Sequence, residues 1–526
     1  MEVLMKKIFK ALVILIAAVL LAFTACGGKT SKGTGAITVE IFDRGSDGGR
    51  SLAHDNAWTD WIKEKVKKDL DIDVTFVPVG RWSETVDIVN LLASGDAPDL
   101  CYTYNTGMIN NFRDQGGILN LAPYIDSHLP DMKKLLGADP AMQADLIYRD
   151  SDPATGAVYS IPSYVVRLAQ RNTFIRKDWL DKLGLPLPRT TQEFHDALAA
   201  FRDRDPGNLG RNLIPYGQDS DARWGLANLI YSYFNLNASD RDRWITGFSD
   251  RPITLPGYKE GVRVANQWYN EGLIYRDFPL VTVADNYHNL LKTGYIGAFS
   301  GNWDLPWRTD YKINEELAIN VPGAEFVPVD PFQSSDGVTW KSISDKPGLR
   351  IFVPSSSKNP EAALRYLNWL CKFENFNYLQ IGIEGVNHEM VNGVPRILTT
   401  PAGHPWFQNS QYNIDMTIPM NGIELLDADK NARVTALGYG DTPAEKIVNA
   451  FNLATVNGRV WVPVYQAVTT KDGLYSQTLV DKADAMLSQS IIARPQDFDR
   501  VWDDAMRDYL SSGAQEVMDE RASLWK

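Results

Sequence analysis

The sequence predicts an α/β protein, and three observations lead to this fold class. Between residues 37 and 104, short β-branched or alternating apolar segments are separated by segments whose apolar residues recur every three to four positions. Strands that alternate with helices pair in parallel, because a parallel pair needs a long crossover connection. Hydrophobic residues make up 44% and charged residues 22% of the 526, so the chain can bury cores. At roughly 100–200 residues per domain, the length corresponds to two to four core-sized units.

The elements follow from these signals in chain order. Strands are expected at 37–42, 72–77 and 100–104, with helices at 56–70 and 83–92 between them. The first helix carries Trp58 and Trp61 at core spacing, and Ser83 is a suitable N-cap for the second. Later elements are helices at 178–183, 191–201, 360–373 and 498–518, and strands at 295–300 and 349–354. Trp179 and Trp369 also fall on helices at core spacing, so we expect them to be packing residues.

The N-terminus indicates export. Lys6, Lys7 and Lys10 precede an unbroken apolar run of 13 residues at 11–23, which is shorter than the ~20 residues of a membrane span and fits a signal peptide. The segment Phe23-Thr24-Ala25-Cys26 resembles a bacterial lipobox, which implies cleavage after residue 25 and lipid attachment to Cys26. The expected order is a signal peptide at 1–25 and a flexible tether at 26–35, with the protein lipid-anchored on the extracytoplasmic face of the cell membrane. The alternative is an ordinary secretory signal with an incidental cysteine.

Composition and motifs narrow the function classes. The net charge of −12 disfavours a nucleic-acid partner, which needs a basic surface. The six histidines are scattered, no zinc-protease or serine-hydrolase motif occurs, and we expect neither metal nor cofactor. Cys101 and Cys371 are expected to be two buried thiols rather than a disulfide. The 65 acidic residues leave a glycosidase pair of carboxylates open, so a secreted glycoside hydrolase is the alternative of a different class.

Four segments together resemble the extracellular solute-binding proteins of family 1, in the large lipoprotein branch that serves carbohydrate ABC importers. They are 91–99 (LLASGDAPD), 156–162 (GAVYSIP) followed by 174–184 (FIRKDWLDKLG), 354–368 (PSSSKNPEAALRYLN) and 382–389 (GIEGVNHE). The resemblance covers essentially the whole chain after the tether.

The resemblance implies a two-lobed periplasmic-binding-protein type II fold with a hinged cleft between the lobes. Lobe one is expected to comprise 36–165 and 345–455, and lobe two 166–344 and 456–526. A ligand that contacts both lobes only when they are closed shifts the equilibrium toward closure. The implied function is to capture a carbohydrate, such as an oligosaccharide, as a monomer without catalysis and to deliver it to the permease subunits of an ABC importer. A peptide or another solute remains the alternative ligand.

The chain has 15 Trp and 22 Tyr, which serve either as core residues or as flat platforms for sugar rings. We expect ligand contacts from polar and aromatic residues in loops that follow strands, because ligands of α/β sheets gather at strand ends. The candidates are Tyr102, Tyr104, Asn105, Tyr164, Arg167, Asp219, Arg223, Trp224 and Trp303. Trp303 is the strongest of them, since the matching family position stacks on sugar; its alternative role is to fill a lobe core.

Some relatives carry a calcium loop after the helix expected at 191–201. The corresponding stretch here is 203–215, in which Asp203, Asp205 and Asn208 are the only acidic or amide side chains before Asn212. Calcium takes six to eight oxygen ligands. These side chains are too few, and we expect no calcium in this loop.

Overall fold

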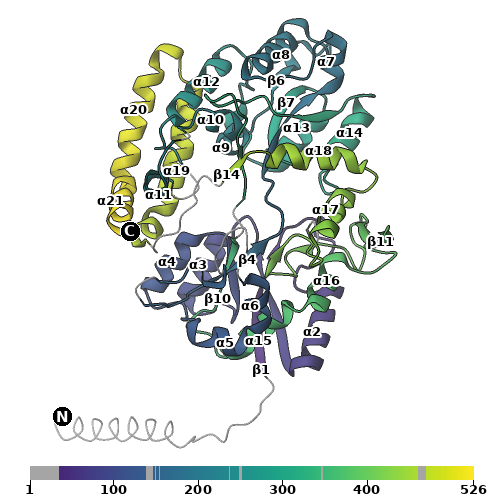
Figure 1. Cartoon of the computed structure of the whole chain (residues 1–526), viewed down its shortest axis with the longest axis vertical. Helices are drawn as coiled ribbons and strands as arrows, with labels where there is room; N and C mark the ends of the chain where they lie inside the picture. Colours follow the sequence, from purple (N-terminus) through teal and green to yellow (C-terminus); the bar gives the residue numbers. More distant parts are fainter. Residues whose placement is uncertain are drawn as a thin grey trace, which may run out of the picture.

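The computed structural model describes residues 35–137, 146–148, 150–152, 155–235, 237–247, 252–344, 347–410, 413–459 and 469–525. The expected signal peptide, Cys26 and nearly all of the tether lie outside the described residues. Figure 1 shows two lobes, with the first third of the chain in one lobe and the middle third in the other. None of the described helices is long and apolar enough to span a bilayer.

The sheet of lobe one is mixed. Its strands are β1 (Gly35–Asp43), β2 (Ile72–Gly80), β3 (Cys101–Thr103), β4 (Ile161–Val165), β10 (Pro347–Phe352) and β13 (Met420–Asn421). β1 pairs in parallel with β2 and bridges to Leu100, just before β3. From β3 the order continues through β10 and β4 to β13. The covering helices include α2 (Ala57–Leu70), α3 (Glu84–Ser94), α4 (Thr106–Asp114), α5 (Ile125–His128), α6 (Pro130–Leu136), α15 (Pro360–Leu370) and α16 (Phe373–Ile381).

Lobe two has a four-stranded sheet in the order β6-β7-β5-β8. The strands are β5 (Arg171–Arg176), β6 (Ile214–Tyr216), β7 (Ile296–Asn302) and β8 (Phe326–Val329). The helices of this region are α7 (Lys177–Leu183), α8 (Thr191–Arg204), α9 (Ala222–Gly225), α10 (Ala227–Tyr231), α11 (Asp240–Thr246), α12 (Tyr258–Asn270), α13 (Ala284–Lys292) and α14 (Ile313–Asn320).

Each lobe has its own hydrophobic core, which is the expected result for two independent sheets. Trp58, Trp179 and Trp369 are fully buried, and Trp61 is partly buried against the first core. The expectation that these four are packing residues is confirmed. Cys101 and Cys371 are buried free thiols, also as expected.

The C-terminal third departs from the expected organisation in two places. α17 (Ala428–Leu437) packs against β12 (Val394–Ile397), which pairs with β11 (His388–Val391), whereas α18 (Ala444–Thr455) packs on β5 and β8. The chain therefore packs on the lobe-two sheet from the start of α18 at residue 444, ahead of the boundary expected at 455. Beyond it, β14 (Gly458–Arg459) pairs with β9 (Lys341–Ser342).

The long C-terminal helix expected at 498–518 is interrupted. α20 (Phe498–Tyr509) and α21 (Gln515–Leu524) are separated by a wide turn at 510–514, in which Gly513 has a φ of 120°. A Cβ atom at Gly513 would lie 2.4 Å from the ring of Tyr475 on α19 (Thr470–Ile492), so this close approach requires glycine. α19 packs on α4 of lobe one as well as on α12 and α20.

Candidate functional site

The strand directions bring four loops of lobe one to a single sheet edge. β1, β2 and β3 run in parallel, and β4 has the same direction because both β3 and β4 are antiparallel to β10. Their carboxyl ends therefore share an edge. The residues at this edge are Arg44 after β1, Arg81 and Trp82 after β2, Tyr104 and Asn105 after β3, and Tyr164 at the end of β4.

Lobe two presents the corresponding edge toward lobe one. β6 and β7 are parallel and β5 is antiparallel to β7, so the start of β5 lies beside the ends of β6 and β7. Residues 166–170 join the end of β4 directly to the start of β5. Such a short connection spans at most about 20 Å. The two edges are therefore held close.

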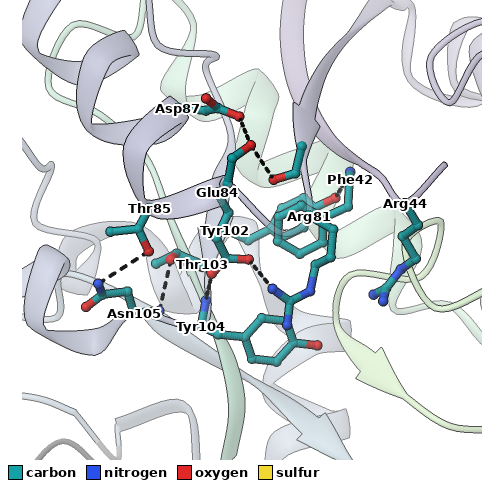
Figure 2. Close-up of polar contacts among 12 residues, drawn as sticks. Phe42, Arg44, Arg81, Glu84, Thr85, Asp87, Tyr102, Thr103, Tyr104 and Asn105 are labelled. Carbon is teal, nitrogen blue, oxygen red and sulfur yellow. Dashed lines mark hydrogen bonds and ion pairs between the residues drawn. The ribbon is translucent and has the colours of Figure 1, made fainter. Parts of the chain in front are cut away.

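On the lobe-one side, Arg81 is surrounded by aromatic rings (Figure 2). Its guanidinium carbon lies 4.4 Å from the ring centroid of Tyr104, 5.0 Å from Trp82 and 5.3 Å from Phe42. Trp82 is 75% exposed and Tyr104 is 40% exposed. Two large apolar rings thus remain open to a ligand next to a positive charge.

A buried carboxylate fixes this aromatic group. Glu84 forms an ion pair with Arg81 at 2.9 Å and accepts hydrogen bonds from the Tyr104 amide at 2.9 Å and the Thr103 hydroxyl at 3.2 Å. Burial raises the pKa of Glu84. Because Glu84 holds both the cation and the backbone of Tyr104, it sets the distance between them.

The other predicted lobe-one residues have different surroundings. Tyr102 is 1% exposed, lies edge-on to Phe42 at 4.6 Å between ring centroids, and accepts a hydrogen bond from the Phe42 amide. Tyr102 therefore lies in the core, two residues before Tyr104 and on the same side of the chain. The Asn105 side chain accepts from the Met108 amide as the N-cap of α4. Tyr164 is half-buried against the lobe-one core.

On the lobe-two side, Trp224 lies against Arg171. The guanidinium carbon of Arg171 is 3.8 Å from the centroid of the indole ring. Asp221 caps the single turn of α9 by accepting a hydrogen bond from the Trp224 amide, which positions the ring. Arg223 lies 3.6 Å from Asp221 and 3.8 Å from Asp484 of α19. Trp224 and Arg223 are both half-buried.

Asp219 lies in the same loop after β6. Burial and the neighbouring carboxylate of Asp221 raise the pKa of Asp219 to about 6. Its side chain accepts from the Asp221 amide at 3.1 Å and from the Gln218 amide at 3.2 Å. It can therefore act as a hydrogen-bond acceptor or, when protonated, as a donor.

Trp303 is placed in the lobe-two core rather than at an open surface. It is 4% exposed and lies edge-to-face with Tyr439 and Phe451, at 5.8 and 5.4 Å between ring centroids. The Trp303 amide donates to Gln170, in the connection between the lobes. Arg167 lies 6.0 Å from its ring and donates to the Tyr439 hydroxyl at 3.3 Å. The alternative role expected for Trp303, to fill a lobe core, matches this position.

Sequence reasoning missed Arg81, Trp82 and Arg171, which are central to this geometry. A signal for Trp82 was present, because it follows a strand that ends at Gly80 and precedes a helix. Arg171 had no local signal, since its importance comes from Trp224, more than 50 residues away.

The fold and the site define a two-lobed solute-binding protein. The model of the bacterial extracellular solute-binding protein family matches residues 51–371, and the chain belongs to this family. The family and its relatives are binding proteins rather than enzymes.

Three curated relatives are similar in sequence. The chain is 26% identical to Lipoprotein LipO of Bacillus subtilis over 62% of each chain. It is 27% identical to the fructooligosaccharide ABC transporter substrate-binding protein FusA of Streptococcus pneumoniae over 41% of each. It is 24% identical to the polygalacturonan/rhamnogalacturonan-binding protein YtcQ of B. subtilis over 62% of this chain and 63% of YtcQ. Each match spans less than two thirds of the relative.

A solved structure shares the fold over nearly the whole chain. The alginate-binding protein AlgQ2, determined without its calcium ion, superposes with a TM-score of 0.68 at 17% identity. The superposition covers 94% of this chain and 98% of AlgQ2. At this identity the likeness defines the fold, which is the expected two-lobed type.

The loop at 203–215 does not fit a calcium ion. Both carboxylate oxygens of Asp205 accept backbone amides, from Leu209 at 2.8 Å and Gly210 at 2.7 Å. Asp203 pairs with Arg202 at 2.7 Å, and the Lys182 ammonium donates to the Pro206 carbonyl. These oxygen atoms of Asp203, Asp205 and Pro206, which could coordinate a calcium ion, are already bound to donor groups of this chain. Within the described parts of the chain, no group of three or more His, Cys, Asp or Glu could hold a metal ion.

Proposed function

We propose that this protein captures an oligosaccharide between its lobes and delivers it to an ABC importer. The observation that carries the proposal is that each facing sheet edge has a Trp beside an Arg, Trp82 with Arg81 in lobe one and Trp224 with Arg171 in lobe two. Sugar rings have an apolar C–H face that stacks on aromatic rings and hydroxyls that bond to charged groups.

The spacing of the two sides favours an oligosaccharide over a monosaccharide. α4 contacts α19 at Gly107, where an added Cβ atom would lie 3.2 Å from the Ser476 side chain. α9 contacts α19 near Asp484, which lies 3.8 Å from Arg223. Eight residues of helix separate these points by about 12 Å along α19. The ligand would therefore extend over more than one sugar ring. The names of FusA and YtcQ, which bind oligo- and polysaccharides, support the same ligand class.

Binding is tested by calorimetry and by thermal shift with a panel of neutral and acidic oligosaccharides. A ligand that binds only the native state raises the melting temperature. Trp82→Ala should weaken binding of the best ligand about ten- to a hundred-fold with an unchanged melting temperature, because Trp82 is 75% exposed. Val86→Ala, at a neighbouring position with 62% exposure, is the matched control. If short peptides bind and no sugar does, the alternative ligand class is correct.

We infer further that Cys26 carries a lipid that anchors the mature chain on the outer face of the membrane. The family is extracellular, and LipO is a lipoprotein. Detergent partitioning should place the expressed protein in the membrane phase and Cys26→Ala in the aqueous phase. Equal partitioning of the two proteins would contradict the inference that Cys26 carries the membrane anchor.

The proposal includes no catalysis. Incubation with each bound oligosaccharide should leave it intact by mass spectrometry. The appearance of shorter products would instead support the glycoside hydrolase alternative.

A further inference from the structure

Arg171 is a buried cation that lacks an acidic partner among the described residues. Its side chain is 5% exposed, and its Nε and Nη1 atoms have no hydrogen-bond acceptor there. Its surroundings are the Trp224 ring at 3.8 Å, the Tyr231 ring at 5.8 Å and a hydrogen bond with the Tyr231 hydroxyl. A guanidinium group stays protonated near neutral pH, and burying its charge without a partner is unfavourable.

The other buried arginines provide an internal comparison. Arg176 forms an ion pair with Asp178 at 2.7 Å, Arg521 with Asp472 at 2.6 Å, and Arg350 with Asp150. Each of these three has its own carboxylate. Arg171 is the exception, and it starts β5 at the edge that faces lobe one.

Neighbouring charges do not supply the missing partner. Arg223 adds a second positive charge close to Arg171. Asp221 is the acidic residue that acts on Arg171, but it already caps α9 and faces Arg223 at 3.6 Å, and its side chain is 47% exposed. Asp219 lies in the same loop as Asp221. Asp484 lies on α19, beside Arg223. The site therefore keeps an unsatisfied planar donor group beside an aromatic ring.

We propose that Arg171 binds the carboxylate of a uronic acid residue in the ligand, so that the captured oligosaccharide is acidic. This inference rests on the proposed oligosaccharide function. The unpaired Nε–H and Nη1–H of Arg171 point to different sides of the guanidinium, so each can donate one charge-assisted hydrogen bond to a carboxylate oxygen. Nε and Nη1 are covered in this structure, and the Trp224 ring lies 3.8 Å from the guanidinium carbon on a helix of only one turn. The proposal requires the Trp224 side chain to rotate away when the ligand binds. The same indole then stacks on the sugar ring that carries the carboxylate.

The test compares trimers of galacturonate, mannuronate and glucuronate with their carboxyl-reduced counterparts, which keep the linkage and lose the charge. The mature wild-type protein should bind at least one acidic trimer about a hundred-fold more tightly than its reduced form, measured by calorimetry. Arg171→Gln should remove that preference, so that the acidic trimer and its reduced form bind with affinities within about twofold of each other. Arg171→Lys should keep a part of it, because it retains the positive charge but not the positions of the two guanidinium donors.

The melting temperatures without ligand control for misfolding. Arg171→Gln should melt at the same temperature as the wild type or higher, because it removes an uncompensated buried charge. Arg350→Gln, the matched control, should melt lower because it leaves Asp150 unpaired. Tighter binding of reduced trimers by the wild type would overturn the inference and keep the proposed function. Binding of no trimer of either kind, by calorimetry or thermal shift, would also overturn the inference, and the wider oligosaccharide panel would then test the proposed function by itself.

Discussion

At the scale of single residues, Trp303 allows a test of whether a tryptophan fills the core or stacks on the ligand. Its burial against Tyr439 and Phe451 predicts that Trp303→Ala lowers the free energy of unfolding by about 3–5 kcal/mol. Denaturant unfolding measures this loss, and calorimetry at low temperature measures binding to the remaining folded protein. We expect the affinity to change less than about threefold. A stable variant with a hundred-fold weaker affinity would restore Trp303 to the ligand site.

Asp219 gives a residue-scale prediction for pH. Its folded pKa of about 6 exceeds the ordinary value of 3.8, because burial and the Asp221 charge oppose ionisation; Tyr287 also lies beside it. The folded state therefore holds a proton that the unfolded state releases, and stability falls as the pH rises from about 4 to about 6. Asp219→Asn should be about 1–2 kcal/mol more stable than the wild type at pH 7, after allowance for partial exposure.

Thermal unfolding at pH 7 and at pH 4 checks this prediction. The advantage of Asp219→Asn should shrink at the lower pH, where the folded carboxyl is protonated and the unfolded one is partly protonated. An advantage that grows on acidification would contradict the pKa direction.

At the scale of elements, the loop at 203–215 is expected to fold without metal. Asp205 has a left-handed backbone with a φ of 41° and accepts two amides of the loop. Asp205→Ala should lower the free energy of unfolding by about 2–3 kcal/mol, since charge-assisted hydrogen bonds are lost. Differential scanning calorimetry should show no change for the wild type with a chelator, and no recovery of Asp205→Ala with calcium. A wild-type melting temperature that drops with chelator and returns with calcium would contradict this.

At the scale of the whole molecule, the contact between α19 and α4 joins the two lobes. A Cβ atom on Gly473 would lie 2.7 Å from the Gly107 carbonyl oxygen, so only glycine permits this approach. Gly473→Val should separate the helices, favour an open arrangement of the lobes and weaken ligand binding about tenfold without touching the ligand. Small-angle scattering should give a larger radius of gyration for the variant without ligand.

Leu474→Ala is the matched control, because Leu474 is the next residue on α19 and is 61% exposed. It should leave both the radius of gyration and the affinity unchanged. Identical behaviour of Gly473→Val and Leu474→Ala would show that the contact does not influence the lobes.

Local pattern alone determined most of the elements. The strand at 37–42, the helix at 56–70 and the capped helix at 191–201 have nearly the expected bounds, because alternation, 3.6-residue spacing and capping are short-range properties of the chain. The four helical Trp residues were assigned to cores by the same spacing. The family resemblance, carried by contiguous segments, gave the two-lobed fold.

Tertiary structure decided which side chains are buried and which lie at the facing sheet edges. Trp303 follows a strand as expected, yet α18, more than 140 residues later, supplies the Phe451 ring that buries it. Arg171 looks ordinary in sequence, and becomes a candidate only because β5 begins beside Trp224 and no carboxylate of the described residues reaches it. Burial and charge compensation depend on contacts between distant segments, and no local pattern encodes them.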